Sequence, residues 1–166
     1  MERIVIIGCG GAGKSTLARQ LGEKLNIPVV HLDKLWWKPN WVESSREVVD
    51  AKLAVELAKP RWIMDGNFNR TIELRLDACD TVIYLDYPRF VCLKSWLGRV
   101  IRNWGRARPD MAAGCAERFD LEFAKWIWNF NKTKRPIYHE LLRQTESKNV
   151  VILKSRRQAR RFLDSL

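Results

Sequence analysis

Short apolar runs alternate with longer amphipathic stretches along the whole chain. The apolar runs predict five buried strands, at residues 3–7, 28–32, 62–64, 81–85 and 149–153. Helical spacing predicts helices at 14–25, 44–59, 71–79, 89–104, 117–131, 136–146 and 155–166, the fifth and sixth being one helix kinked at Pro136 or two helices. Such alternation indicates an α/β fold whose parallel sheet is covered on both faces. Ligands of these sheets bind at the carboxyl ends of the strands.

Two predicted helices begin with a capping box, in which a serine and a residue three positions later cap the first turn together. These boxes are Ser44-x-x-Glu47 and Ser155-x-x-Gln158. Pro60 closes the helix at 44–59. The segment 105–114 contains Pro109 and ends at Gly114, which predicts a loop.

Length and composition indicate a single soluble domain. The chain has 166 residues, of which 46% are apolar and 30% are charged, which excludes a disordered or low-complexity chain. No apolar run reaches the roughly 20 residues of a membrane helix, and the first residues lack the features of a secretory signal. We therefore expect a cytoplasmic protein. The four cysteines form no CxxC pair and only two histidines are present, so we expect core thiols and no zinc site.

The positive charge lies in the second half of the chain. Residues 1–88 carry equal numbers of basic and acidic side chains, so the whole net charge of +11 falls on residues 89–166. This asymmetry favours an anionic partner, which composition leaves open among nucleotide phosphates, a nucleic acid and a membrane surface.

Residues 8–15 read GCGGAGKS and fit the pattern GxxxxGK[ST] between a predicted strand and a predicted helix. Glycines allow the backbone N–H groups to turn toward phosphate oxygens, and the helix start adds positive potential. Lys14 would reach the β- and γ-phosphates, and the Ser15 hydroxyl would ligate Mg²⁺. The motif predicts a phosphate-binding loop for ATP and Mg²⁺, with nucleotide contacts from Gly8, Gly10, Gly11, Ala12, Gly13, Lys14, Ser15 and Thr16.

The same glycines spell GxGxxG, and Asp33 lies 20 residues after Gly13, as in a dinucleotide-binding fold. That fold has no use for the Lys14-Ser15 pair, and 166 residues leave little room for a separate substrate domain. Binding of NAD is therefore the weaker interpretation.

Phosphoryl transfer also needs a carboxylate near Mg²⁺. Asp65 ends the third predicted strand and Asp86 ends the fourth. Asp65 is otherwise explained as a turn residue, and Asp86 as an acid at a helix start. We favour Asp65 as the metal carboxylate and keep Asp86 as the alternative.

The turn Asp65-Gly66-Asn67-Phe68-Asn69-Arg70 resembles the Asp-Gly-Phe-Pro-Arg segment of adenylate kinases, with the proline replaced. The chain resembles the nucleoside monophosphate kinase branch of P-loop proteins over essentially its whole length. Four blocks are more similar to a bacterial group of DNA topology modulation proteins, namely residues 31–35 (HLDKL), 38–41 (KPNW), 65–67 (DGN) and 108–120 (RPDMAAGCAERFD).

The resemblance implies one P-loop domain over residues 1–166, with three layers and a five-stranded parallel sheet in the order 2-3-1-4-5. It implies an acceptor-side insertion at about 34–60 and a short helical lid at about 104–118. The implied activity is ATP- and Mg²⁺-dependent phosphoryl transfer to a small nucleotide- or nucleoside-like acceptor.

The resemblance also implies roles for single residues. Arg70 matches an arginine that binds the acceptor phosphate, and Asn67 and Asn69 depart from the pattern in the turn that shapes the acceptor pocket. The implied catalytic residues are Lys14, Asp65, Arg99, Arg102 and Arg118. The strand-to-helix segment at 153–156 would flank the adenine, which brings Arg156 to the nucleotide.

An arginine cluster and an aromatic cluster lie near these positions. Arg99, Arg102, Arg106 and Arg108 would repel one another without anions, which predicts that 105–114 is mobile until phosphates arrive. Trp36 and Trp37 follow Asp33 on an expected loop with Trp41, where they stack a substrate or pack on the core. Asp33 itself would bind the substrate or act as the base for a hydroxyl acceptor.

A second hypothesis is a nucleic-acid-binding protein that the nucleotide regulates. The helix at 155–166 carries four arginines and would offer a basic face.

Overall fold

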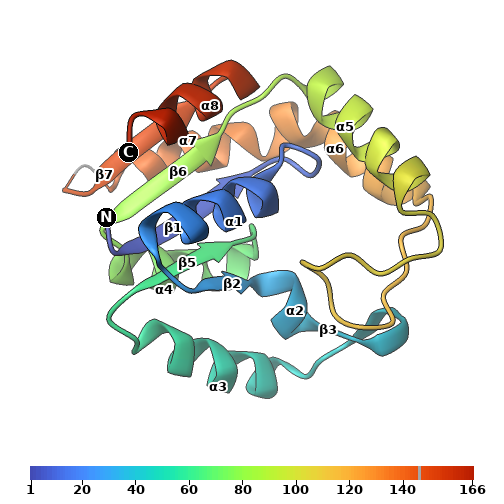
Figure 1. The fold of residues 1–166 in the computed structure, drawn as a ribbon, viewed down its shortest axis with the longest axis horizontal. Coiled ribbons are helices and arrows are strands. Elements are labelled where there is room, and N and C mark those ends of the chain that lie inside the picture. Colours follow the sequence, from blue (N-terminus) through green and yellow to red (C-terminus); the bar gives the residue numbers. More distant parts are fainter. Residues whose placement is uncertain (146) are drawn as a thin grey trace.

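A five-stranded parallel sheet lies at the centre of the molecule (Figure 1). The structure, a computed structural model, describes residues 1–145 and 147–166. The sheet strands are β1 (Arg3–Gly8), β2 (Val29–His31), β5 (Trp62–Asp65), β6 (Thr81–Leu85) and β7 (Asn149–Leu153). Their order in the sheet is β2-β5-β1-β6-β7. Counted along the main sheet alone this is 2-3-1-4-5, so the predicted fold class is confirmed.

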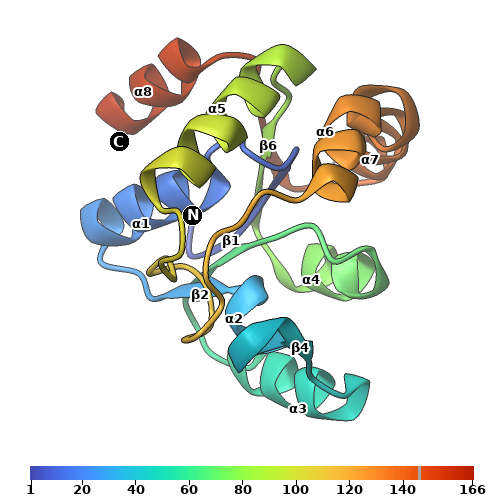
Figure 2. The same ribbon diagram turned by 90° about the vertical axis from the view of Figure 1, so that its right-hand side faces the viewer.

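Helices cover both faces of the sheet. They are α1 (Lys14–Leu25), α2 (Leu32–Trp36), α3 (Arg46–Leu57), α4 (Ile72–Ala78), α5 (Arg89–Arg102), α6 (Leu121–Thr133), α7 (Arg135–Arg143) and α8 (Arg156–Asp164). Figure 2 shows α1, α5 and α8 on one side of the strands and α4, α6 and α7 on the other. Within the part of the chain that the structure describes, no helix is long and apolar enough to cross a membrane.

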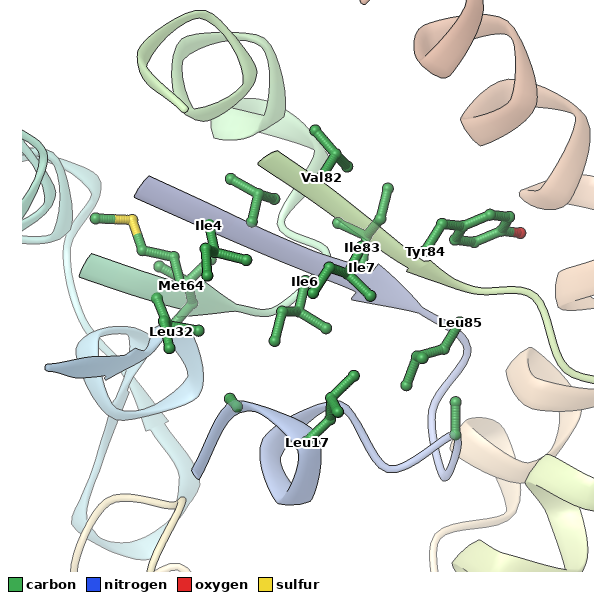
Figure 3. Packing of buried hydrophobic residues seen from close by; sticks show 14 of the residues in the cluster. Ile4, Ile6, Ile7, Leu17, Leu32, Met64, Val82, Ile83, Tyr84 and Leu85 are labelled. Atoms are coloured by element: carbon green, nitrogen blue, oxygen red, sulfur yellow. The ribbon is translucent and has the colours of Figure 1, made fainter. Parts of the chain in front are cut away.

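The central strands are apolar on both faces, as the sequence pattern predicts. Ile4, Ile6 and Ile7 of β1 are fully buried, and so are Val82 and Ile83 of β6. In Figure 3, Ile6 and Leu85 lie on the side of the sheet where Leu17 of α1 packs. Burial of this cluster on both faces aligns the strand ends, and the loops that follow them form one edge of the sheet.

The structure differs from the predicted elements between β2 and β5. The expected tryptophan loop is a short ordered unit of α2, β3 (Trp37–Lys38), a 3-10 turn (Pro39–Trp41) and β4 (Val42–Glu43). The strands β3 and β4 pair antiparallel. Two-residue strands are too short to show an alternating pattern, so the sequence alone did not predict them.

Two predictions about helix starts are corrected. The capping box at Ser44 is wrong, because α3 begins at Arg46 and Ser44 is buried. At α8 only half of the box forms. The Ser155 hydroxyl accepts a hydrogen bond from the Gln158 N–H, whereas the Gln158 side chain accepts from Lys154 N instead of Ser155 N.

The lid expected at about 104–118 is not helical. Residues 103–120, all described, contain no helix and cross back on themselves through bridges at Trp104–Glu117 and Ala107–Ala116. We call residues 103–120 the crossing loop. The loop predicted at 105–114 lies within it. The helix expected from residue 117 begins at Leu121, where the Asp120 carboxylate caps the Phe123 N–H at 2.9 Å.

The two helices expected around Pro136 are separate. Lys134 ends α6 and precedes α7, and Pro136 stands in the first turn of α7, where a proline needs no hydrogen-bond partner. The last residue of the helix predicted at 136–146, Glu146, lies outside the described residues.

Candidate functional site

The loop at residues 8–15 connects β1 to α1 and wraps around a bend that only glycines allow. Gly11 and Gly13 have φ values of +77° and +97°, in the left-handed region that favours glycine. A Cβ on Gly11 would lie 2.3 Å from the Cys92 carbonyl oxygen, so this glycine also permits close packing on α5. The Lys14 ammonium donates to the carbonyl oxygens of Gly8 and Cys9 at 2.9 and 3.1 Å. The loop therefore has the curled backbone and inward lysine of a phosphate-binding loop.

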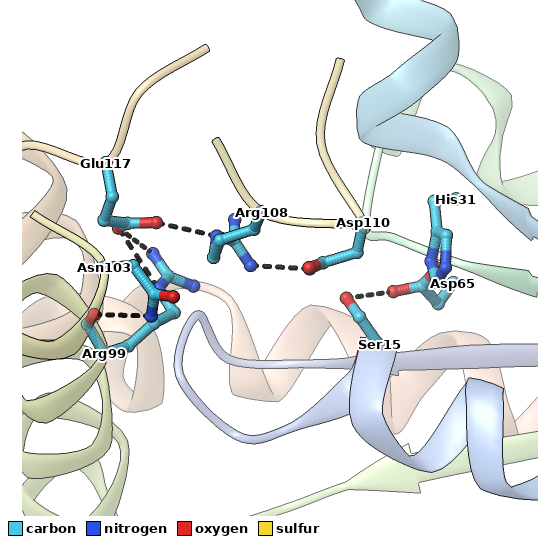
Figure 4. A network of polar contacts seen from close by, with 8 residues as sticks. All are labelled: Ser15, His31, Asp65, Arg99, Asn103, Arg108, Asp110 and Glu117. Carbon is cyan, nitrogen blue, oxygen red and sulfur yellow. Dashed lines mark hydrogen bonds and ion pairs between the residues drawn. The ribbon is translucent and has the colours of Figure 1, made fainter. Parts of the chain in front are cut away.

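The Asp65 carboxylate at the end of β5 lies between two partners, His31 at the end of β2 and Ser15 at the start of α1. Asp65 Oδ2 accepts a hydrogen bond of 2.6 Å from the Ser15 hydroxyl, and Asp65 Oδ1 lies 2.5 Å from His31 Nδ1 (Figure 4). His31 and Asp65 face each other in the register of β2 and β5. Asp65 is buried, so these contacts fix its orientation. Sequence analysis missed His31, although its position at the end of the second strand was the available signal.

Asp86, the alternative carboxylate, is engaged elsewhere. The Arg135 guanidinium donates two hydrogen bonds of 2.7 Å to its two oxygens, and His139 Nε2 lies 3.3 Å away. Burial opposes ionisation of the Asp86 carboxyl, but its contacts with the Arg135 guanidinium and with His139 hold its pKa below the usual range. Asp86 lies outside the walls of the cavity described below.

Burial changes two ionisable groups beside the loop. Desolvation and the nearby Asp65 carboxylate raise the pKa of Asp33, while Lys14 and Arg108 oppose the change. Desolvation lowers the pKa of Lys14, against the attraction of Asp65 and Asp33. Lys14, Asp33 and Asp65 therefore form one cluster of opposite charges beside the loop.

The side chains of Asn67 and Arg75 hold the turn after β5, in which the proline of the resembled segment is replaced. The Asn67 side chain accepts from the Gly8 N–H at 3.1 Å and donates to the Gly8 carbonyl at 2.9 Å. Arg75 is fully buried and donates to the carbonyl oxygens of Gly66, Asn67 and Phe68. Burial lowers the pKa of Arg75 to about 10, so the guanidinium remains charged at neutral pH. The departure at Asn67 thus ties this turn to β1.

Two of the four arginines in the predicted cluster, Arg99 and Arg108, are paired with carboxylates, which corrects the expectation that the whole cluster repels itself. Arg99 donates to Glu117 Oε1 at 2.9 and 3.1 Å, and Arg108 Nε lies 2.7 Å from Glu117 Oε2. Arg108 also donates to Asp110 at 2.5 Å (Figure 4). Glu117 and Asp110 are buried and neutralise both arginines. Sequence analysis did not assign a role to either carboxylate.

One cavity of about 360 Å³ brings most of the predicted residues together. Its walls include Gly10, Gly11, Gly13, Lys14, Ser15, Thr16, Asp33, Asp65, Arg99, Arg102 and Arg156. Arg19, Arg108, Asp110 and Phe123 also line it and were not among the predicted site residues. Phe123 reaches the loop because α6 packs on α5, which no local pattern reveals.

Six predicted residues lie outside this cavity, and Arg70 is described separately below. Gly8 is the last residue of β1, and Trp36 packs on Phe68 with ring centres 5.8 Å apart. Trp37 and Arg118 line a second cavity of about 250 Å³. Ala12 lines a third cavity.

Arg70 is not brought to any of these three cavities. Its guanidinium pairs with Asp50 of α3 at 2.6 Å, on an exposed surface. This pair forms because the turn after β5 directs residue 70 toward α3.

The third cavity, of about 550 Å³, lies between the start of α1 and α8. Thr16, Leu17, Tyr87, Arg156 and Arg160 are among its lining residues. It shares Gly13, Thr16 and Arg156 with the first cavity, so one elongated ligand can reach both.

The residues that line the first and third cavities fit a nucleoside triphosphate with Mg²⁺. The loop is open at Gly13, because a Cβ added to this residue would meet no heavy atom within 4 Å. Ser15 and Asp65 supply the oxygen donors that Mg²⁺ prefers, and Lys14 supplies positive charge beside them.

Comparisons with known proteins agree with this geometry. No family model matches the chain. The chain is 36% identical over 104 residues to an adenylate kinase of Mycobacterium ulcerans, 32% over 106 residues to one of a Nocardioides species, and 35% over 104 residues to one of Mycobacterium marinum. These matches cover 61–62% of this chain and 54–56% of the relatives. The chain thus spans about half the length of the curated relatives it matches.

Solved structures show the fold. The shikimate kinase of Bacteroides thetaiotaomicron superposes with a TM-score of 0.59 at 16% identity, covering 99% of this chain and 95% of that one. The shikimate kinase of Acinetobacter baumannii in complex with shikimate gives 0.60 at 17% identity, over 99% and 90%. The chain therefore has the P-loop fold that these kinases share.

Proposed function

We propose that this protein transfers the γ-phosphoryl group of ATP to a small-molecule acceptor. One observation supports the proposal above all: the loop lysine, the Ser15–Asp65 pair and the Asp33 carboxylate line a single cavity. Phosphoryl transfer depends on positioning and charge stabilisation, and these groups supply both. Similarity to adenylate kinases over part of the chain supports the same reaction class.

The nucleotide would lie along the first and third cavities. The backbone N–H groups of residues 10–15 and the Lys14 ammonium would hold the phosphates, and the base would occupy the space between α1 and α8 beside Arg156. The triphosphate would displace the Lys14 ammonium from the two carbonyl oxygens that now accept its hydrogen bonds. Lys14 then neutralises charge at the transferring group.

Ser15 and Asp65 would hold Mg²⁺, with His31 keeping the Asp65 carboxylate in orientation. When bound, Mg²⁺ neutralises charge on the β- and γ-phosphates. Arg99 and Arg102 line the same cavity and would stabilise charge on the transferring group. Arg118 would do so from the crossing loop after that loop closes.

The test is ADP release with ATP, Mg²⁺ and a panel of small acceptors. We expect one class of acceptor to stimulate ADP release well above the rate without acceptor. Lys14→Ala should abolish this release and leave thermal unfolding unchanged within a few degrees, because the hydrogen bonds that its ammonium donates within the described residues both go to carbonyl oxygens of the loop. Lys52→Ala, at an exposed position on α3, is the matched control. Unchanged ADP release by Lys14→Ala would exclude the proposed function.

A second candidate function, nucleotide-regulated binding of nucleic acid, is supported by α8. Arg156, Arg157, Arg160 and Arg161 are all exposed on this helix. Such a face neutralises phosphates, and its affinity for DNA would fall steeply with salt. Duplex binding measured against salt at saturating ATP tests it, with Arg157→Ala and Arg161→Ala expected to reduce the slope. This function would also account for the resemblance to the DNA topology modulation group.

A further inference from the structure

The second cavity, of about 250 Å³, adjoins the first and has aromatic walls. Trp37 and Trp41 line it from the β3–β4 unit, Trp96 from α5 and Phe123 from α6. The rings of Trp37 and Trp41 meet edge to face, with centres 5.4 Å apart and planes at 72°. The Trp41 indole N–H donates to the Ala116 carbonyl at 3.0 Å, which fixes this ring against the crossing loop. Fixed aromatic faces favour a planar, apolar ring.

The two cavities meet at shared residues. Asp33, Arg99, Arg108 and Phe123 belong to the walls of both. A molecule in the aromatic cavity therefore lies beside the phosphate-binding loop. The volume, at the low end of small-molecule sites, excludes a macromolecule as the occupant.

Most of the charged groups in the aromatic cavity have partners among the described residues; the exceptions are Asp33 and Arg118, whose guanidinium lies over the Trp41 ring. Arg99 and Arg108 are paired with Glu117, and Arg108 is also paired with Asp110. Asp120 caps α6. A phosphate group that binds Arg99 or Arg108 would have to break these ion pairs, because both arginines are already paired with carboxylates (Figure 4). Of the three arginines in these walls, Arg118 alone has no carboxylate partner among the described residues, so the walls offer fewer free guanidinium groups than an arginine cradle for a phosphorylated acceptor.

Asp33 is the one shared wall residue whose side chain offers an unused acceptor. No group within residues 1–145 and 147–166 donates a hydrogen bond to its carboxylate. It stands where the aromatic cavity opens toward Lys14 and Ser15. A carboxylate accepts hydrogen bonds from hydroxyl groups, and an ionised one repels phosphate.

We propose that the aromatic cavity binds the phosphoryl acceptor, and that this acceptor is a hydroxyl compound with a planar ring and no phosphate group, as in a nucleoside. The inference rests on the proposed function. The ring packs on Trp37 and Trp41, and the reacting hydroxyl donates its hydrogen bond to Asp33. As the hydroxyl oxygen bonds to the γ-phosphorus, its proton passes to Asp33 and the bond from that phosphorus to the β–γ bridging oxygen breaks, which releases ADP.

The first experiment compares matched acceptors. ADP release with ATP and Mg²⁺ is measured for adenosine against AMP, cytidine against CMP, guanosine against GMP and thymidine against TMP. We expect at least one nucleoside to stimulate release, and its monophosphate to have a kcat/KM at least tenfold lower. Stimulation by the monophosphates alone would overturn the inference and leave the proposed function standing. Release that Lys14→Ala does not change would instead remove the proposed function.

The second experiment tests the aromatic wall directly. Trp37→Ala should raise the KM of the effective nucleoside about tenfold and leave the KM of ATP unchanged. Trp104→Ala is the control, because Trp104 is 63% exposed and lies outside all three cavities. Calorimetry of nucleoside binding with a non-hydrolysable ATP analogue gives a readout besides activity, and Trp37→Ala should weaken it equally. A loss of melting temperature without any change in nucleoside affinity would assign Trp37 to packing alone and overturn the inference.

If Trp37→Ala fails to fold, Trp37→Phe is measured in its place, because phenylalanine retains an aromatic face of smaller area. We then expect an intermediate affinity. Absence of both nucleoside binding and nucleoside-stimulated release in the native protein would also overturn the proposed acceptor class.

Discussion

The Ser15 hydroxyl and the Asp65 carboxylate, 50 residues apart in the chain, are joined by a hydrogen bond of 2.6 Å. Ser15 stands in the first turn of α1, and Asp65 ends β5, which pairs with β1. The parallel pairing brings the end of β5 beside the loop that follows β1. A hydroxyl and a carboxylate side by side offer oxygen donors of the kind that Mg²⁺ prefers, and they give the first prediction.

Asp65→Asn should lower Mg²⁺-dependent ADP release about 10²–10³-fold, on the scale of a lost electrostatic contact in a transition state. Nucleotide binding without metal should change little, because the loop and Lys14 remain. Asp86→Asn should leave the Mg²⁺ dependence unchanged and lower the free energy of unfolding by about 1–3 kcal/mol, since Arg135 loses its charged partner. Metal titrations of ADP release, together with urea unfolding, check both variants. If Asp86→Asn lowered the Mg²⁺-dependent ADP release and Asp65→Asn did not, Asp86 would be the metal carboxylate.

Gly11→Ala and Gly13→Ala separate backbone strain from steric clash. Both residues have positive φ, so each alanine should cost about 1–2 kcal/mol of strain. Only at Gly11 would the new Cβ also meet a backbone atom, the Cys92 carbonyl oxygen at 2.3 Å. We therefore expect Gly11→Ala to be clearly less stable than Gly13→Ala in urea unfolding. Equal losses would mean that the loop moves away from α5 at little cost.

Glu117→Gln should loosen the crossing loop. Glu117 is buried and pairs with both Arg99 and Arg108, so the neutral amide leaves two arginines close together without a carboxylate between them. Trypsin cleavage after Arg106 should become about tenfold faster than in the native protein, whereas the Arg108–Pro109 bond resists trypsin. Glu122→Gln is the control, because Glu122 is exposed and pairs only with Lys125 on the same helix. Equal cleavage rates in all three proteins would show that these ion pairs do not hold the loop.

Arg118→Ala should reduce kcat about 10²-fold and change the KM of ATP little. Arg118 is exposed, with its guanidinium 5.6 Å from the centre of the Trp41 ring, and it lines the aromatic cavity but not the phosphate-binding one. We expect it to reach the phosphates only after the crossing loop closes over both substrates. Arg106→Ala, on the same loop and in none of the three cavity walls, should have native kcat. Steady-state kinetics decide the matter, and a native kcat for Arg118→Ala would refute a catalytic role.

Asp33→Asn should be more stable than the native protein at neutral pH and far less active. Burial and Asp65 raise the pKa of Asp33 in the folded state above its ordinary value of 3.8. As pH rises above about 4, the unfolded chain releases this proton first, so the native protein loses stability until the folded-state pKa is passed. Asparagine has no proton to lose, and the gap in melting temperature between variant and native protein should widen over that pH range, by about 2–4 °C for each kcal/mol.

Melting curves from pH 4 to 8 measure this gap. Parallel curves for the two proteins would contradict a raised pKa. ADP release should fall about 10²-fold or more in the variant, because asparagine cannot accept a proton.

Local patterns were enough to predict the sheet and the phosphate-binding loop. The apolar runs that become β1 and β6 are buried on both faces, and such strands are recognisable without their partners. The loop at 8–15 was equally readable, since its glycines and lysine act through backbone conformation and charge within eight residues. Asp65 and Asp33 were found because parallel strands end at one edge of a sheet.

Only the tertiary structure decided what each charged group faces. Arg70 pairs with Asp50 of α3, and both Arg99 of α5 and Arg108 of the crossing loop pair with Glu117. His31 faced Asp65 through strand register. Strand and helix patterns indicate which positions are buried, because the polarity of each residue largely determines its own burial. The charge that a side chain meets depends on residues brought close by folding, and in this protein those partners come from other elements.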